Sequence, residues 1–142
     1  GVICAAVKNL ESGETVEGGS TLTMQLIRTL YISNERTFKR KIREAKLAEE
    51  LENIHSGRQG KAWILTKYLN SVPYGTNGGQ TAVGIQAGAR LFFDKPASEL
   101  KLREAALLAG LPQAPSQYNP FLNASAAKAR VISIAPGTAM SG

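Results

Sequence analysis

Apolar side chains recur at helical spacing along most of this 142-residue chain, and that spacing limits the folds open to it. Leu22, Leu26 and Leu30 stand four residues apart, as they would on one face of a helix. No stretch alternates apolar and polar residues as a half-buried strand does, and valine and isoleucine do not cluster. The sequence therefore predicts an all-α fold, and its 43% of hydrophobic residues are enough for one hydrophobic core.

A long helix is predicted after a break at Ser33-Asn34, ending at Gly57. Its opposite faces are expected to be charged and apolar, and the apolar stripe would consist of Phe38, Ile42, Ala45, Leu51 and Ile54. Trp63 and Tyr68, which follow this helix, are expected to be core residues.

Three further helices are predicted over residues 61–72, 81–93 and 98–111, the last with Ser98 as its N-cap. Small residues fill the second of these, so it is expected to pack closely against its neighbours. Residues 74–81, YGTNGGQT, contain so much glycine that a loop is predicted rather than regular structure.

The balance of charge favours an anionic partner. Lysine and arginine number 17 against 11 acids, which gives a net charge of +6 and an isoelectric point near 9.7. The single cysteine, Cys4, excludes an internal disulfide, and with one histidine, His55, a structural zinc site is not expected. No apolar run approaches the roughly 18 residues of a membrane span, although an anchor before Gly1 would leave no trace in this sequence.

The stretch EGGSTLTMQLIR, residues 17–28, is a loop that runs into a helix. Unpaired backbone N–H groups and the positive end of the helix dipole make such an entrance a natural site for an anion. The groups available for binding are those of Gly19, Ser20, Thr21, Thr23, Gln25 and Arg28. The same residues also fit a helix that is only well capped, by Ser20 or Thr21.

The next stretch, RTFKRKIREAK, covers residues 36–46. On a helix, Arg40 and Lys41 lie four and three residues before Glu44, so the three side chains share one stripe. A carboxylate between two cations leaves the cations with capacity for an outside anion. An exposed helix with ordinary pairs at i,i+4 spacing is the alternative.

Basic residues are concentrated in one short segment, at Arg28, Arg36, Arg40 and Lys41. Such a patch beside a helix N-terminus suits a diphosphate, whose charges must be neutralised in a confined place. A nucleic-acid groove would more often interleave aromatic residues with basic ones, and aromatic residues make up only 6% of this chain. We therefore expect a phosphorylated ligand and no nucleic acid.

Four motifs together resemble the peptidoglycan glycosyltransferase family 51, the transglycosylase module of class A penicillin-binding proteins and their monofunctional relatives. GGSTLTMQ (18–25) resembles the family's GGSTxTxQ motif, and RKIRE (40–44) its Arg-Lys-x-x-Glu motif. ILTKYLNSVPYG (64–75) is similar to its I-L-x-x-Y-L-N…Y-G motif, and EAALLAGLPQAPSQYNP (104–120) to its last. Their order along the chain is the family's order.

This resemblance implies an all-α, lysozyme-like domain that polymerises lipid II at the outer face of the bacterial cytoplasmic membrane. The donor is a growing glycan on a polyprenyl diphosphate. The 4-hydroxyl of a lipid II sugar attacks its anomeric carbon, and inversion gives a β-1,4 bond. The implied partners are lipid II, the lipid-linked glycan, the membrane surface and a transpeptidase domain or protein.

The resemblance also implies roles for individual residues. Glu44 matches the family's second glutamate, a catalytic group near the diphosphate. Arg28 and Arg36 match two basic positions attributed to diphosphate binding, and Arg40 and Lys41 complete the patch. Some members use a divalent cation, Mg²⁺ or Mn²⁺, at the diphosphate, and the sequence predicts no metal-ligating residue for it.

Two departures from the family pattern concern the ends of the chain. The family's first motif, which carries the glutamate regarded as the general base, would end just before Gly1, so we expect a fragment of a longer enzyme. Residues 1–130 are expected to form a partial glycosyltransferase domain, and residues 131–142, VISIAPGTAMSG, a loosely ordered tail without helical period. A catalytically incomplete fragment or scaffold that binds lipid diphosphate is the alternative hypothesis.

Overall fold

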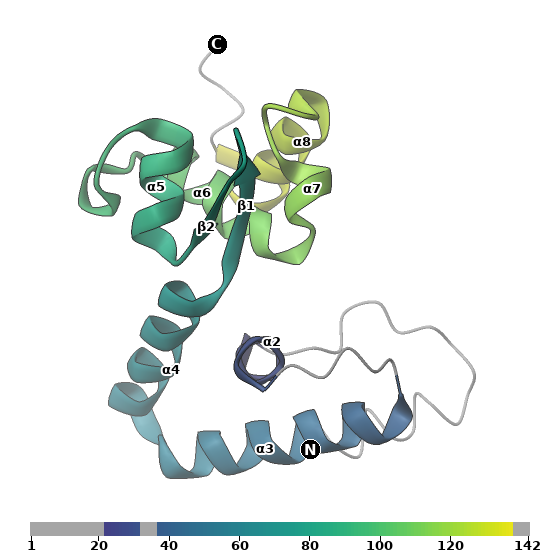
Figure 1. Cartoon of the computed structure of the whole chain (residues 1–142). Helices are drawn as coiled ribbons and strands as arrows, with labels where there is room; N and C mark the ends of the chain where they lie inside the picture. Colours follow the sequence, from purple (N-terminus) through teal and green to yellow (C-terminus); the bar gives the residue numbers. More distant parts are fainter. Residues whose placement is uncertain (1–21, 32–36, 138–142) are drawn as a thin grey trace. The chain divides into compact units, whose positions relative to one another are not determined.

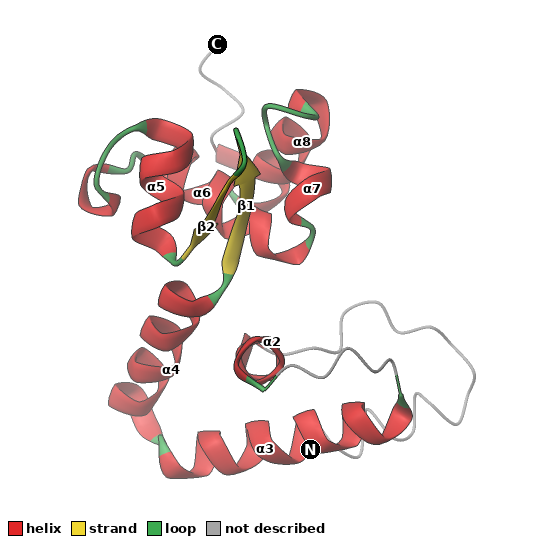
Figure 2. Ribbon diagram, viewed as in Figure 1, coloured by secondary structure: helices red, strands yellow, loops and turns green. Residues whose placement is uncertain are grey.

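The computed structural model describes residues 22–31 and 37–137, most of which are helical (Figures 1 and 2). The chain divides into two compact units, residues 1–68 and residues 69–142. Two features predicted from the sequence, the helix cap at Ser20 or Thr21 and the break at Ser33-Asn34, lie outside the described residues.

The first unit contains helix α2 (Leu22–Leu30), helix α3 (Phe38–Ile54) and most of helix α4 (Gly57–Ser71). Helix α2 packs against α3. The small core between them consists of Met24, Ile27 and Ala48, with Ala45, Leu47 and Leu51 packed against it. No helix in the described ranges is long and apolar enough to cross a membrane.

Helix α3 does not bury most of the apolar stripe predicted from its sequence. Phe38, Ile42 and Ile54 are 54%, 40% and 75% exposed. The buried positions are instead Ala48 and Glu44. Hydrophobic periodicity does not predict this buried face, because one of its two buried residues is the carboxylate Glu44. Ion pairs with arginine side chains allow Glu44 to be buried.

A tight corner joins α3 to α4. Gly57 opens α4 with a φ of +71°, a conformation that favours glycine. Gly60 is buried in the next turn, and a Cβ there would lie 1.9 Å from the carbonyl oxygen of His55. Helix α4 therefore begins at Gly57, four residues before the predicted start at Lys61. Trp63 is 39% exposed and stacks on His55, so it is not the core residue predicted, whereas Tyr68 is buried.

Replacing Gly60 by alanine is expected to destabilise this corner. The new methyl group would meet backbone rather than a flexible side chain, so α3 and α4 would have to move apart. We expect Gly60→Ala to lower the free energy of unfolding by about 1–3 kcal/mol or more. Chemical denaturation measures the change, and Gln59→Ala, at the exposed neighbouring position, is the matched control. Equal stability of Gly60→Ala and the unsubstituted chain would contradict the packing described.

The second unit contains a β-hairpin where the sequence predicted a loop. Strands β1 (Pro73–Asn77) and β2 (Gln80–Val83) pair antiparallel, with Thr76 opposite Thr81. Gly78 and Gly79 connect them with φ angles of +56° and +79°. Positive φ at both central residues is the geometry of a two-residue hairpin turn, so the glycines that argued against regular structure are what the turn requires.

Helices surround the hairpin in the second unit (Figure 2). Tyr74 of β1 is fully buried, and a Cβ on Gly88 of α5 would lie 3.1 Å from its ring, which confirms the close packing predicted for the small-residue helix. The other elements of this unit are α5 (Ile85–Phe93), η1 (Ala97–Glu99), α6 (Leu102–Gly110), η2 (Leu111–Gln113), α7 (Pro115–Tyr118) and α8 (Ala124–Ile134).

Two predictions about helix ends in this unit are wrong. Ser98 does not cap α6 but lies in η1, and the helix starts after Lys101, whose N–H donates to the Glu104 carboxylate at 2.7 Å. Residues 131–134 do not belong to a loosely ordered tail, because α8 continues through them to Ile134. Its N-cap is Asn123, whose side-chain oxygen accepts the N–H of Ala126 and starts the helix.

Glu104 forms an ion pair with Lys95 in the second unit. The ammonium group of Lys95 lies 2.7 and 2.8 Å from its two oxygens. This hydrogen bond, helped by the Lys101 N–H, holds the pKa of the Glu104 carboxyl below its usual 4.5. A lowered folded-state pKa contributes stability above the unfolded value, and that contribution is lost as the pH falls through the folded value.

We therefore expect Glu104→Gln to weaken the acid dependence of stability. Thermal unfolding midpoints, followed from about pH 7 down to about pH 3, should fall less steeply in this variant than in the unsubstituted chain. Glu99→Gln, which changes a nearby exposed glutamate, should retain the original dependence. Parallel curves for all three proteins would show that the Lys95 contact does not contribute.

Candidate functional site

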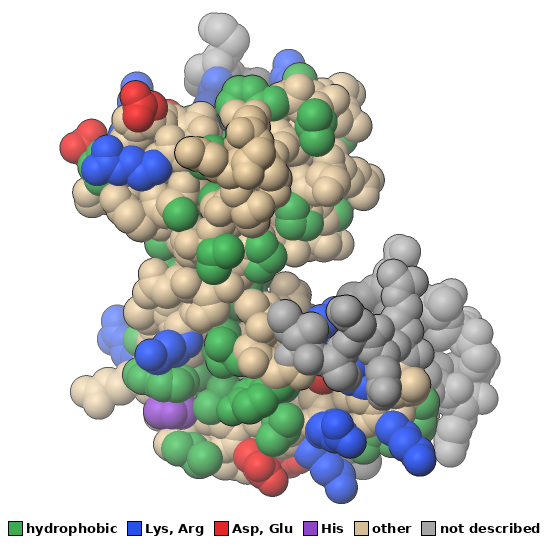
Figure 3. All heavy atoms as spheres, in the orientation of Figure 1, with side chains coloured by type: hydrophobic (Ala, Val, Ile, Leu, Met, Phe, Trp, Pro, Cys, Tyr) green, Lys and Arg blue, Asp and Glu red, His purple; other side chains and the backbone are tan. Residues whose placement is uncertain are grey.

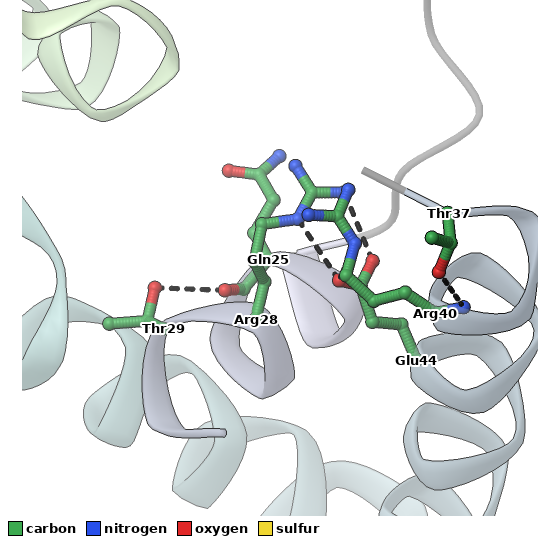
Figure 4. Close-up of polar contacts among 6 residues, drawn as sticks. All are labelled: Gln25, Arg28, Thr29, Thr37, Arg40 and Glu44. Atoms are coloured by element: carbon green, nitrogen blue, oxygen red, sulfur yellow. Dashed lines mark hydrogen bonds and ion pairs between the residues drawn. The ribbon is translucent and has the colours of Figure 1, made fainter. Parts of the chain in front are cut away.

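Helices α2 and α3 bring two guanidinium groups onto one carboxylate (Figure 4). Arg28 Nη2 lies 3.1 Å from Glu44 Oε2, and Arg28 Nε lies 3.4 Å from Glu44 Oε1. Arg40 Nε is 3.1 Å from Glu44 Oε1 and forms an ion pair with it across one turn of α3. We call Arg28, Arg40 and Glu44 the guanidinium cluster.

The local sequence sets this geometry. Thr37 caps α3, with its side-chain oxygen accepting the N–H of Arg40, so Arg40 lies in the first turn and Glu44 one turn later. Arg28 lies in the last turn of α2, which packs against α3. Of the three residues in the predicted stripe, Arg40, Lys41 and Glu44, the structure pairs Arg40 with Glu44, and α2 adds Arg28 to this pair.

The guanidinium cluster combines a buried carboxylate with two partly exposed cations. The Glu44 side chain is 6% exposed, whereas those of Arg28 and Arg40 are 43% and 22% exposed. Arg40 Nε is buried and lacks hydrogen-bond alignment with any described acceptor, so its contact with Glu44 is mainly electrostatic. Two cations face one carboxylate, so positive charge remains, and the exposed part of Arg28 can present it to an anion.

Gln25 lies one turn before Arg28 on the same face of α2. Its backbone carbonyl accepts a hydrogen bond from the Thr29 hydroxyl at 2.9 Å. Its side-chain Oε1 accepts one from the Tyr68 hydroxyl at 3.1 Å. In Figure 4 the Gln25 amide extends to the same side of α2 as the two guanidinium groups.

The remaining predicted residues lie apart from the cluster or outside the described ranges. Lys41 is exposed, and no ion pair joins it to Glu44. Thr23 is buried at 5% exposure, and its hydroxyl donates to Glu52 Oε1 at 2.6 Å, so it links α2 to α3. The predicted binding residues of which the structure says nothing are Gly19, Ser20, Thr21 and Arg36.

Basic side chains gather over the first half of α3 on the face shown in Figure 3. The basic residues of this helix fall between Lys39 and Lys46, whereas its exposed acids, Glu49, Glu50 and Glu52, follow in the second half. This separation places the positive surface next to the guanidinium cluster.

The described residues offer no protein-held metal centre. Within residues 22–31 and 37–137, no group of three or more His, Cys, Asp or Glu side chains could hold a metal ion. The cations that pair with Glu44 in the cluster are the side chains of Arg28 and Arg40.

Sequence reasoning missed the contribution of Tyr68 to this region. The phenol of a buried tyrosine needs a hydrogen-bond partner, and this need was a signal in the sequence. Nothing in the sequence identified Gln25, 43 residues earlier, as that partner.

Comparisons with known proteins agree with the motifs. A family model described as Transglycosylase matches residues 1–137. Penicillin-binding protein 1A of Neisseria lactamica is 44% identical over 130 residues, which cover 92% of this chain and 15% of that protein. Penicillin-binding protein 1A of Aquifex aeolicus is 43% identical over 120 residues, covering 84% of this chain and 15% of that protein.

Penicillin-binding protein 1B of Vibrio cholerae is also similar, at 42% identity over 126 residues, which cover 89% of this chain and 16% of that protein. The chain thus spans about one-sixth of the length of the curated relatives that it matches. The matched family also fits the predominantly helical fold, in which the described strands form one hairpin.

Proposed function

The chain belongs to the transglycosylase family, and we propose that, within a longer protein, it polymerises lipid II into β-1,4 glycan strands. The observation that carries this proposal is the guanidinium cluster: Arg40 and Glu44 belong to the motif RKIRE, and Arg28 lies three residues after the end of GGSTLTMQ. The relatives are named as penicillin-binding proteins, and the parent of this chain is proposed to catalyse the glycan-forming reaction.

The cluster suits the leaving group of that reaction. When the sugar hydroxyl attacks the anomeric carbon, the bond to the polyprenyl diphosphate breaks and negative charge builds on the departing oxygen. Guanidinium groups that are already fixed in place stabilise such charge without reorganising. Arg28 and Arg40 are fixed by Glu44, and the planar fork of each guanidinium matches the spacing of phosphate oxygens.

Glu44 is proposed to organise the cations rather than to accept the proton. Both of its oxygens are engaged by arginine, and its side chain is only 6% exposed. A general base has to reach the attacking hydroxyl directly or through one water molecule. The proton acceptor is therefore proposed to be another group, in agreement with the resemblance, which places the general base in a motif before Gly1.

The proposed partners follow from the reaction. Lipid II and the lipid-linked glycan both carry a polyprenyl chain, so the parent is proposed to act at the outer surface of the bacterial cytoplasmic membrane. A divalent cation at the diphosphate, and a transpeptidase domain or protein working with the parent, stay predictions.

Incubating the parent protein with purified lipid II tests the proposal. We expect glycan polymer to form, with one polyprenyl diphosphate released for each glycosidic bond. Binding of lipid II without polymer would instead support the alternative, a scaffold that holds lipid diphosphate. Neither binding nor polymer would contradict both.

A further inference from the structure

We propose that Tyr68 is a positioning residue of the diphosphate site and that it acts by fixing the side-chain amide of Gln25. This inference rests on the function proposed above and deepens it. It assigns a role in ligand recognition to a residue of α4 that the motifs alone would place in the hydrophobic core.

The contact that carries the inference joins α4 to α2. The Tyr68 hydroxyl donates to Gln25 Oε1 at 3.1 Å, and Tyr68 is only 9% exposed. Gln25 is half-buried and projects from α2 one turn before Arg28. A buried phenol that has one partner holds that partner in place, because leaving either group unpaired has a free-energy cost.

The orientation of the amide follows from this contact. Since Oε1 accepts from Tyr68, the amide nitrogen is turned away from the phenol, and its N–H groups make no hydrogen bond within the described residues. Figure 4 shows the amide extending to the same side as the guanidinium groups of Arg28 and Arg40. The structure therefore presents two N–H donors beside two cations, which suits oxygens of a diphosphate or of the sugar attached to it.

An amide that was free to rotate would not keep its N–H groups turned toward an anion. Rotation by half a turn would exchange the N–H donors for a carbonyl oxygen, which repels an anion. In the rotated orientation the phenol oxygen would accept an N–H of the amide, and the phenol proton would then have no acceptor among the described residues. The observed orientation satisfies that buried proton, so Tyr68 favours it.

The phenol keeps its donor role over the whole physiological range of pH. Burial raises the pKa of the Tyr68 hydroxyl above its ordinary value of 10.0. The neutral form, which is the one that donates, therefore persists beyond pH 10, and Tyr68 adds no titration of its own to activity at lower pH.

The test is a double-mutant cycle in the full-length parent protein. Tyr68→Phe removes only the hydroxyl and retains the ring, whereas Gln25→Ala removes the amide. The dissociation constant for lipid II in detergent and the kcat/KM of polymerisation are measured for both single variants and the double variant. Tyr68→Phe alone should weaken lipid II binding about five- to tenfold, as expected for one misplaced hydrogen-bonding group.

Coupling distinguishes positioning from packing. In a protein that already carries Gln25→Ala, Tyr68→Phe should cause no further loss, because the amide that it positions is gone. A role in packing alone would give the same loss in both backgrounds. The matched control is Tyr74→Phe, which removes the hydroxyl of another buried tyrosine, one that donates to the Leu69 carbonyl, and it should leave lipid II affinity unchanged.

The outcomes separate this inference from the proposed function. An equal loss in both backgrounds, or no loss in either, overturns the positioning role while polymerisation by the unsubstituted parent still supports the function. If the unsubstituted parent neither binds nor polymerises lipid II, the proposed function fails and the positioning role fails with it. A loss from Tyr68→Phe only where Gln25 is intact, in a parent that polymerises lipid II, supports both.

Discussion

Glu44→Gln is expected to lower the rate of glycan polymerisation by the parent protein about a hundredfold, the scale observed when one electrostatic contact to a transition state is removed. The amide is neutral and replaces one carboxylate oxygen with an N–H donor. Arg28, which donates to this carboxylate, and Arg40, which forms an ion pair with it, would then repel each other and lose their fixed orientation. The measurement is the initial rate of polymer formation from lipid II.

Glu44→Gln should also destabilise the fold, whereas the same substitution at an exposed position of α3 would change the free energy of unfolding very little. Glu44 is 5% exposed, and removing one partner of a buried ion pair is costly. Because Arg28 and Arg40 are partly exposed, water compensates some of this cost, and we expect a loss of about 1–3 kcal/mol in the free energy of unfolding.

Glu50→Gln is the matched control for Glu44→Gln, since it makes the same chemical change at an exposed position of the same helix. It should retain both the polymerisation rate and the stability of the parent. Full activity in a folded Glu44→Gln variant would remove Glu44, and with it the organisation of the cations, from the mechanism.

Arg28→Ala is expected to weaken binding of polyprenyl diphosphate about 10- to 100-fold, because charge-assisted hydrogen bonds from a guanidinium contribute about 1.5–3 kcal/mol. Arg28 is the more exposed cation of the cluster, at 43%, so it is the one best placed to meet a ligand. Titration of the detergent-solubilised lipid against the parent protein measures the dissociation constant.

Salt and a matched variant distinguish a specific contact from general attraction. Arg43→Ala removes an exposed arginine from α3, one residue before Glu44, and should change affinity only through weak, salt-screened attraction. The loss in Arg28→Ala should persist as the salt concentration rises. Equal affinities of Arg28→Ala and Arg43→Ala would contradict the assigned role of Arg28.

The sequence predicted the parts of the structure that depend on local patterns. The predominantly helical fold, the break at Gly57 and the pairing of Arg40 with Glu44 all follow from spacing along one helix or from the conformation of one residue. The motifs also identified the family, because long motifs in a fixed order are specific where single residues are not.

The sequence did not predict features that depend on tertiary contacts. Glu44 belongs to the face of α3 that was predicted to be charged, and it is buried there because Arg28 reaches it from another helix. The contact between Tyr68 and Gln25 joins residues that are 43 positions apart, so no local pattern encodes it. In the hairpin, Gly78 and Gly79 looked like breakers of regular structure, although a tight turn needs their positive φ angles.

The most direct test of the proposed diphosphate site is the structure of the parent protein bound to polyprenyl diphosphate. The guanidinium cluster should contact the ligand, with diphosphate oxygens about 2.7–3.2 Å from guanidinium nitrogens of both Arg28 and Arg40, and Glu44 still paired with them. A diphosphate bound in the protein with neither arginine in contact would contradict the central claim.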